Sequence, residues 1–213
     1  MDKLITHKAT REWVEALIFA AVVAIVVRTF LFAPFRIPSG SMIPTIQIGD
    51  QIFATMFSYG IPVPLTDIKF FEEPVQRGDI VIFPAPPDPS IDFIKRTIAL
   101  EGETIEIRDD KVYIDGKLLP EPYAFFDPEN RSASQYPNVS NFGPVTVPKE
   151  HILTMGDNRY NSHDGRFWGF VPTKKVKGKG QMVYWSKDVR EGITGFFEWD
   201  SYRFRRIFHF LEQ

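Results

Sequence analysis

The chain has 213 residues, a formal net charge of −2 at neutral pH and no cysteine. This length fits one domain, or one domain with a large insertion, and 44% of hydrophobic residues are enough to fill a core. The near-neutral charge argues against a nucleic-acid partner. The lack of cysteine excludes disulfides, thiolate metal sites and a cysteine nucleophile.

An apolar segment lies near the N-terminus. Residues 1–12 are polar, whereas residues 13–34 are interrupted only by the charged residues Glu15 and Arg28. A helix of that length spans about 33 Å, roughly the hydrocarbon thickness of a bilayer, so the segment predicts a transmembrane anchor. A cleaved secretory signal is the alternative, but residues 31–34 lack the small-x-small pattern of a processing site.

The orientation of this anchor follows from charge. Residues 1–12 contain more basic than acidic side chains, which predicts a cytoplasmic N-terminus and a chain on the outer face from residue 35 onwards. A serine at position 41 follows the anchor by seven residues, so it lies within about 25 Å of Pro34 even in a fully extended chain. We therefore expect its substrates to be chains held in the membrane.

The rest of the chain alternates short apolar runs with turns, which predicts an all-β fold built from antiparallel sheet. The predicted strands cover residues 49–56, 78–83, 91–100, 104–107, 111–114, 152–155 and 181–185. Asp115-Gly116 is typical of a two-residue hairpin turn. Residues 120–145 are rich in Pro, Asn, Ser and Gly and are predicted to be loops. No helix is predicted outside the N-terminal segment.

A stiff loop, residues 35–45, directly follows the apolar segment. Pro38 and Pro44 restrict its backbone, and Gly40 permits a sharp turn between two serines. A hydroxyl held on such a loop suits nucleophilic catalysis, because positioning supplies much of the rate. Ser41 is therefore a candidate nucleophile, although an ordinary Pro/Ser/Gly connector also fits these residues.

A serine nucleophile needs a base, which is either a histidine or an uncharged lysine. Of the four histidines, His151 and His163 lie outside the two terminal tails. Lys95 is the lysine candidate, because in an extended strand it shares a largely apolar face with Phe93 and Thr97. Burial on such a face lowers the pKa of a lysine by several units. A lysine that protects an edge strand from aggregation is the alternative.

A turn-rich segment, residues 156–172, concentrates Asn, Asp, Ser and Gly. Asp164 and Arg166 are spaced to form a bracing ion pair within it. A metal site made of Asp157, His163 and Asp164 is conceivable, but the spacing matches no known ligand pattern. We therefore predict no metal and no cofactor.

Three of these segments, taken together and in this order after an apolar span, resemble the bacterial type I signal peptidases, which are membrane-bound Ser-Lys serine endopeptidases also called leader peptidases. The matching segments are Ile37-Pro38-Ser39-Gly40-Ser41-Met42-Ile43-Pro44-Thr45, Gly78-Asp79-Ile80-Val81 with Ile94-Lys95-Arg96, and Gly156-Asp157-Asn158-Arg159 through Asp164 to Val171-Pro172. The resemblance covers roughly residues 13–104 and 152–186. Residues 105–150 share only the general character of the family's sequences in this region. At the positions of Tyr160, His163 and Gly165, many relatives have other small or polar residues.

The resemblance implies roles for the candidate residues. Ser41 would be the nucleophile and Lys95 the general base, while the Ser41 amide and the Ser39 hydroxyl would form the oxyanion hole. Ser162 would hydrogen-bond to the Lys95 amine and orient it. Asp164 and Arg166 would support this arrangement from behind Ser162. The residues that would line a shallow substrate pocket for small side chains are Ile37, Met42, Ile46, Phe93 and Ile94.

The resemblance also implies an organisation for the whole chain. The expected parts are a cytoplasmic N-terminus at 1–12, a transmembrane anchor at 13–34, a catalytic β core at 35–104 and 152–213, and an inserted, smaller, loop-rich β region at 105–151. The C-terminal residues 196–211 mix aromatic side chains with arginines. They suit either a last β element of the core or contact with the membrane interface.

The function implied is cleavage of N-terminal signal peptides from exported preproteins after small-x-small sites, on the outer face of the bacterial cytoplasmic (inner) membrane. The partners would be preprotein signal peptides, the lipid bilayer and, transiently, the secretion machinery. Two alternatives stay open. The chain could be a non-catalytic, membrane-tethered β-domain that binds exported chains, or a Ser-His hydrolase that uses His163.

Overall fold

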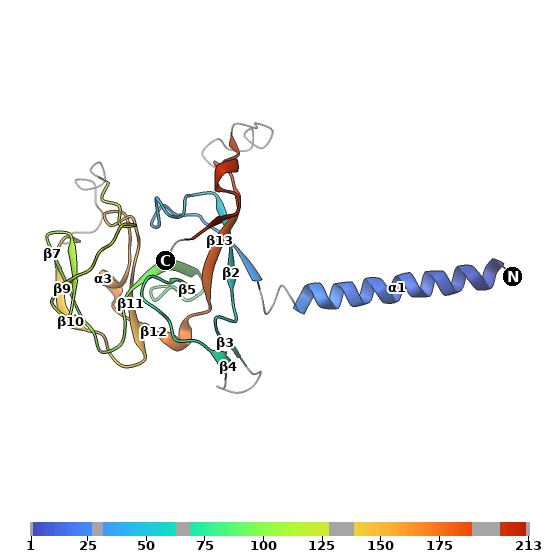
Figure 1. Cartoon of the computed structure of the whole chain (residues 1–213), viewed down its shortest axis with the longest axis horizontal. Coiled ribbons are helices and arrows are strands. Elements are labelled where there is room, and N and C mark those ends of the chain that lie inside the picture. The colour runs from blue at the N-terminus through green and yellow to red at the C-terminus, as the bar shows by residue number, and fades with distance from the viewer. Residues whose placement is uncertain (1, 27–31, 63–68, 128–138, 189–200, 212–213) are drawn as a thin grey trace.

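The computed structural model of the chain describes residues 2–26, 32–62, 69–127, 139–188 and 201–211. Within these ranges, β-strands form two adjoining sheet regions and one long N-terminal helix extends away from them (Figure 1). The predicted all-β fold, with antiparallel sheet as its main element, is confirmed.

The long helix is α1 (Asp2–Val26), which includes the predicted polar N-terminus and the first part of the predicted anchor. None of the helices in the described ranges is both long enough and apolar enough to cross a membrane. The predicted anchor, residues 13–34, continues through residues 27–31, which lie outside the described residues. Its last three positions belong to the strand β1 (Phe32–Arg36), because they pair with the backbone of the next strand.

The main sheet has eight strands, all antiparallel, in the order β1-β2-β13-β5-β6-β11-β12, with β14 beside β13. Besides β1, they are β2 (Asp50–Thr55), β5 (Ile80–Pro84), β6 (Asp92–Ala99), β11 (His151–Met155), β12 (Val171–Pro172), β13 (Gly178–Ser186) and β14 (His209–Phe210). β5 is buried on both faces along most of its length, which is why its sequence is a continuous apolar run and does not alternate.

A smaller sheet is formed by the chain between β6 and β11. It has the order β10-β7-β8-β9, from β7 (Thr104–Arg108), β8 (Lys111–Ile114), β9 (Lys117–Leu118) and β10 (Phe142–Thr146). The predicted hairpin turn joins β8 to β9, with φ of 50° at Asp115 and 76° at Gly116. A shared apolar cluster that includes Ile98, Ile105 and Leu153 packs this sheet against β6 and β11.

Short elements complete the fold. A two-stranded ribbon pairs β3 (Tyr59–Pro62) with β4 (Lys69–Glu72), and the short helices are α3 (Gly165–Trp168), η2 (Thr173–Lys175) and η5 (Phe204–Arg206). These helices were not predicted, because a single turn shows no periodicity. In α3 the Asp164 side chain accepts a hydrogen bond from the Arg166 amide and so caps the turn.

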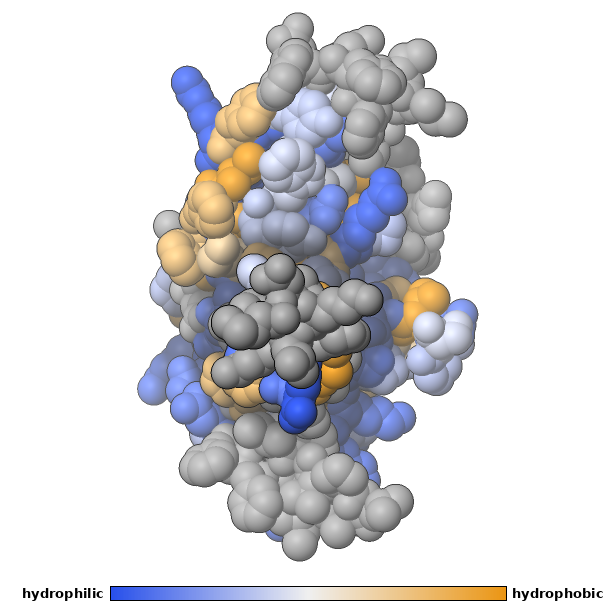
Figure 2. Space-filling model, turned by 90° about the vertical axis from the view of Figure 1, so that its right-hand side faces the viewer, coloured by the Kyte–Doolittle hydropathy of each residue, from blue (hydrophilic) through white to orange (hydrophobic). Residues whose placement is uncertain are grey.

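The C-terminal segment, residues 201–211, adds an edge to the main sheet. β14 pairs with β13, and Leu211 is buried in the same apolar cluster as Ile37 and Ile52. This confirms the interpretation as a last β element. Phe204, Phe208 and Phe210 of the same segment remain 55%, 69% and 69% exposed. In Figure 2, which views the molecule from the side of α1, apolar residues gather in the upper part of the face above a largely hydrophilic surface.

Candidate active site

Ser41 lies in the loop of residues 37–49 that joins β1 to β2, which we call the nucleophile loop. Its ends are tied together, because the Ile37 amide donates to Asp50 O and the Gly49 amide donates to Ile37 O, both at 3.0 Å. Apolar side chains of the loop point into the core, so that Ser41 is only 8% exposed and sits at the edge of a cavity. The loop therefore holds the Ser41 hydroxyl in a largely dry environment.

Lys95 reaches this hydroxyl from β6. Its Nζ donates to Ser41 Oγ at 2.7 Å and to Ile94 O at 3.0 Å, and it lies 5.1 Å from the centre of the Phe93 ring. The lysine is 4% exposed. Burial lowers its pKa from 10.5 to about 8, with the carboxylates of Asp164 and Asp157 opposing the shift. A lysine with this pKa is a free amine in about one molecule in ten at pH 7.

A cavity of about 440 Å³ opens beside the two side chains. Three residues that were predicted to line a substrate pocket, Ile37, Phe93 and Ile94, do line it. Met42 and Ile46 do not, because they are fully buried in the apolar cluster beneath the nucleophile loop. The prediction for these two residues is corrected accordingly: they support the floor of the loop and do not face the cavity.

The two candidate histidines occupy different places. His163 lines the cavity and packs against the ring of Phe167, with centroids 5.4 Å apart. His151 lies on β11, where its Nδ1 is 2.8 Å from Lys149 O. In the described part of the chain, the side chain recorded at hydrogen-bond distance from Ser41 Oγ is Lys95.

Asp164 and Arg166 form the predicted ion pair behind the lysine. Arg166 Nε and Nη2 donate to the two carboxylate oxygens at 2.8 and 2.9 Å, and the Gly156 amide donates to Asp164 Oδ2 at 3.0 Å. Burial alone would raise the pKa of Asp164, but the Arg166 guanidinium and these hydrogen bonds outweigh it and keep the pKa below its usual value. The carboxylate is therefore a fixed negative charge near Lys95.

Ser162 does not make the predicted hydrogen bond to the Lys95 amine. Its buried hydroxyl is close enough to Asp164 to help lower the pKa of that carboxyl, but it meets hydrogen-bond geometry with no atom of the described chain. It also crowds Gly156, since a Cβ at that position would overlap both the Ser162 hydroxyl and the Ser41 carbonyl oxygen. The lysine instead directs its amine to Ser41 and Ile94.

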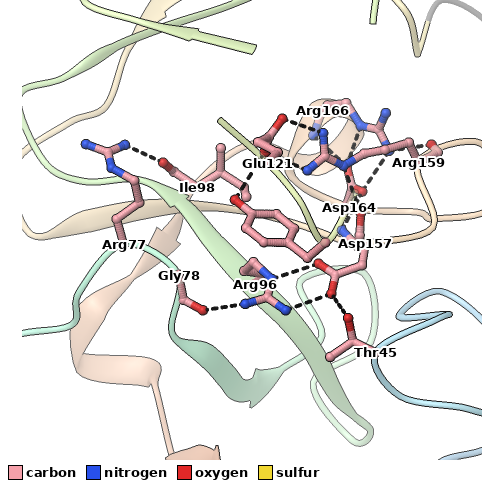
Figure 3. A network of polar contacts seen from close by, with 12 residues as sticks. Thr45, Arg77, Gly78, Arg96, Ile98, Glu121, Asp157, Arg159, Asp164 and Arg166 are labelled. Atoms are coloured by element: carbon pink, nitrogen blue, oxygen red, sulfur yellow. Dashed lines mark hydrogen bonds and ion pairs between the residues drawn. The ribbon is translucent and has the colours of Figure 1, made fainter. Parts of the chain in front are cut away.

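A buried network fixes the loop against β6 (Figure 3). Arg96 donates to both oxygens of Asp157, at 2.9 and 2.8 Å, and to Gly78 O at 3.0 Å. Asp157 also accepts from Thr45 Oγ1 at 2.6 Å, which ties it to the nucleophile loop. The same carboxylates that were considered as metal ligands are thus bound by arginines, and no cluster of metal-ligating side chains occurs in the described ranges.

A family model described as signal peptidase, peptidase S26, matches residues 10–185 of the chain. The chain belongs to the signal peptidase family. It is 35% identical to a signal peptidase I of Pseudomonas fluorescens over 77% of this chain and 68% of the relative, and 37% identical to one of Bacillus licheniformis over 81% and 87%. A crystal structure of a signal peptidase I from Enterococcus faecalis, 35% identical, covers 50% of this chain and 97% of its own, with a TM-score of 0.40.

In this signal peptidase, the residues after Gly156 hold the nucleophile loop directly. The Asn158 amide donates to Ser41 O at 3.1 Å, and Asn158 Nδ2 donates to Gly40 O at 3.2 Å. Sequence reasoning placed this segment near the site, but it assigned no role to Asn158 and considered Asp157 only as a metal ligand. Their signal was the density of Asn and Asp beside Gly, which predicted turns and could not predict which backbone groups they would hold.

The nucleophile loop also holds two hydrogen-bond donors at the cavity, the Ser39 hydroxyl and the Ser41 amide. Ser39 is exposed at the cavity, and its hydroxyl makes no recorded hydrogen bond within the described chain, nor does the Ser41 amide. Other residues that line the cavity were not assigned to a substrate pocket from the sequence. They are Phe35, Arg36, Ile82, Ile91, Asp92, Asn161 and His163, of which His163 was considered only as an alternative base and as a metal ligand.

Proposed function

We propose that this peptidase is a membrane-anchored serine endopeptidase that removes N-terminal signal peptides from exported preproteins, with Ser41 as nucleophile and Lys95 as general base. The observation that carries the proposal is the 2.7 Å contact between Lys95 Nζ and Ser41 Oγ at the wall of a cavity. The relatives named signal peptidase I support the substrate class.

The chemistry divides into two acyl-transfer steps. The neutral Lys95 amine accepts the proton of Ser41 Oγ as this oxygen attacks the substrate carbonyl carbon. The tetrahedral intermediate collapses, the peptide bond breaks, and the lysine gives its proton to the leaving amine of the mature chain. The lysine then takes a proton from a water molecule as the water attacks the Ser41 ester. It returns this proton to Ser41 Oγ when the ester C–O bond breaks, and the signal peptide leaves with a new carboxylate.

The oxyanion of both tetrahedral intermediates would be bound by the Ser41 amide and the Ser39 hydroxyl. Both groups are available as donors, because neither makes a recorded hydrogen bond in the described chain. Donors fixed in advance in a site that excludes water stabilise such charge strongly. Asp164 and Arg166 would keep the lysine in place, and Ser162 would assist with its unpartnered buried hydroxyl.

Substrate choice would follow from the shape of the cavity. Ile37, Phe93 and Ile94 give it apolar walls close to Ser41, which suits small side chains such as alanine at the first and third positions before the cut. The expected cleavage site is therefore small-x-small. Cleavage needs no cofactor in this scheme, since the serine and the lysine supply both nucleophile and base.

The apolar segment that precedes β1 would anchor the enzyme as a single span in the bacterial cytoplasmic membrane, with the β part on the outer face. The support is the apolar run of residues 16–27 and the apolar side chains gathered on the face that is turned to α1 (Figure 2). There it would meet preproteins held in the bilayer and come into transient contact with the secretion machinery.

Cleavage of a purified preprotein by the full chain in detergent tests this function. We expect Ser41→Ala and Lys95→Ala each to lower kcat by at least about 10³-fold, because the serine and its base act as one unit. Lys111→Ala, which removes an exposed lysine at the start of β8, serves as the matched control and should cleave normally. Circular dichroism shows whether each variant keeps the fold.

Other outcomes would contradict the proposal in distinct ways. Near-normal cleavage by Lys95→Ala would exclude the lysine as base, and inactivation by His163→Ala in the same assay would indicate a Ser-His hydrolase. Binding of preprotein without turnover by the unaltered chain, indifferent to both substitutions, would indicate a non-catalytic tethered domain.

A further inference from the structure

The C-terminal segment, residues 201–211, runs beside the nucleophile loop and is fixed to the main sheet. The Arg203 amide donates to Ser186 O at 3.1 Å and the Leu211 amide donates to Gln181 O at 2.8 Å, so both ends of the segment are held by β13. β13 pairs with β2, the strand into which the nucleophile loop leads. The segment therefore has a fixed position relative to the loop.

Arg206 of this segment joins the loop to a buried carboxylate. Its Nη2 donates to Thr45 O at 2.9 Å and to Asp50 Oδ2 at 2.6 Å, and its Nε lies 3.1 Å from each Asp50 oxygen. Asp50 is fully buried and also accepts from Ser186 Oγ at 2.6 Å and from the Gln47 amide at 2.8 Å. The carboxylate thus orients the guanidinium, and the guanidinium holds a loop carbonyl.

Thr45 is held from two sides as a result. Its hydroxyl donates to Asp157 Oδ2 at 2.6 Å, on the side of β6 and the active-site segment, while its carbonyl accepts from Arg206 on the side of the C-terminus. A second arginine of the C-terminal segment, Arg203, donates to Ile48 O at 3.0 Å near the end of the loop. The loop that carries Ser41 is therefore fixed between two parts of the chain.

We propose that Arg206 is a positioning residue for peptide cleavage, acting through the Thr45 carbonyl to hold Ser41 in line with Lys95. This inference rests on the proposed function of the Ser41–Lys95 pair. It also lies outside the part of the chain that the family model matches, which ends at residue 185. A displacement of a nucleophile by about 1 Å is enough to lower a rate about 10²-fold, so a small relaxation of the loop matters.

A simpler role for Arg206 is to neutralise Asp50 and so to stabilise the fold. Arg206→Lys separates the two roles. A lysine keeps a positive charge near the carboxylate, but it is a single point donor and lacks the fork that contacts Asp50 and the Thr45 carbonyl together. A role limited to charge is rescued by lysine, whereas a role in holding the loop is not.

The test measures kcat, KM and the unfolding temperature for the full chain in detergent with a small-x-small peptide substrate. We expect Arg206→Ala and Arg206→Lys each to lower kcat about tenfold or more while KM stays within about twofold, because the cavity walls are unchanged. Arg206→Lys should unfold within a few degrees of the unaltered protein. Arg205→Ala is the control, since Arg205 is an adjacent exposed arginine with no recorded contact, and its kcat should not change.

Three results would overturn the inference. They are an unchanged kcat in both Arg206 variants, full recovery of kcat by Arg206→Lys, and an equal loss in Arg205→Ala. Inactivity of the unaltered chain towards the peptide would instead refute the proposed function, so the two failures are distinguishable.

Discussion

Lys95 occupies a position in which a charged amine is costly. It is buried among Phe93, Ile94 and the nucleophile loop, and its amine donates to one neutral hydroxyl and one carbonyl. Desolvation therefore shifts its pKa down to about 8, although Asp164 and Asp157 pull in the other direction. With such a pKa, roughly one lysine in ten is neutral at pH 7, compared with fewer than about one in a thousand for an exposed lysine.

This shift predicts the pH dependence of cleavage. The base must be neutral to accept the Ser41 proton, so the active fraction falls as pH falls below the pKa of Lys95. We expect kcat/KM to rise about tenfold per pH unit below about pH 8 and to level off above it. Initial rates of peptide cleavage between pH 6 and 10 provide the measurement.

Circular dichroism over the same pH range is the control, because it separates titration of the base from loss of the fold. A rise in kcat/KM that follows a pKa near 10.5, the ordinary pKa of lysine, would mean that the amine is not desolvated in solution. A profile that is flat between pH 7 and 9 would mean that the titrating base is a different group.

At the scale of elements, the segment of residues 119–127 connects the smaller sheet to the active-site segment. The Phe125 amide donates to Asp157 O at 2.7 Å, and Phe125 O accepts from the Arg159 amide at 2.9 Å. Glu121 binds Arg159 through two hydrogen bonds of 2.8 and 2.6 Å, in a site where both side chains are almost fully buried. The smaller sheet thereby helps to hold the backbone that contacts Ser41.

Removal of the Glu121 carboxylate should therefore destabilise the protein. In Glu121→Ala the guanidinium of Arg159 stays buried without its partner, which costs about 3–5 kcal/mol of unfolding free energy. Glu106→Ala breaks a more exposed pair, with Arg108, and should cost no more than about 1 kcal/mol. Urea unfolding of both variants and of the unaltered chain gives the comparison. Equal losses in the two variants would show that the buried pair does not hold the segment.

The sequence allowed the elements with a periodic pattern to be predicted. β2, β5, β6, β7, β8, β11 and β13 each fall within or beside a predicted strand, since apolar runs between turn residues are local signals. Met42 and Ile46 were assigned to the pocket from the family resemblance, and the sequence could not correct this, because the direction of a side chain on an irregular loop has no period. Arg206 and Glu121 were missed for a different reason. An ion pair between segments far apart in the chain gives no recognisable pattern in the local sequence of either segment.

At the scale of the whole molecule, the site joins parts of the main sheet that are not neighbours. The nucleophile loop leads into β2, Lys95 lies on β6, and β13 and β5 separate these two strands in the sheet order. The contact of Ser41 with Lys95 is therefore a tertiary contact that the strand order alone does not give. This is a physical reason why a family resemblance predicts the pairing, whereas the local patterns of the two segments do not.

The position of the site relative to the membrane yields the last prediction. If the apolar segment before β1 spans the bilayer with residues 1–12 inside, the loop that carries Ser41 lies close to the outer surface, since few residues separate the segment from the loop. The full chain should then stay with the membrane fraction after alkaline carbonate extraction. Protease added to spheroplasts should digest the β part, whereas the same protease added to inverted vesicles should leave it protected.

A variant of the cytoplasmic end provides a matched test of the orientation. Lys3→Glu combined with Lys8→Glu removes basic residues from residues 1–12 and leaves the apolar run intact, so it should weaken the preference for this orientation and reduce the protease-accessible fraction in spheroplasts. Release of the unaltered chain by carbonate would show that the segment does not span the membrane. Protection in spheroplasts and digestion in inverted vesicles would place Ser41 on the cytoplasmic side, where exported preproteins have not yet crossed.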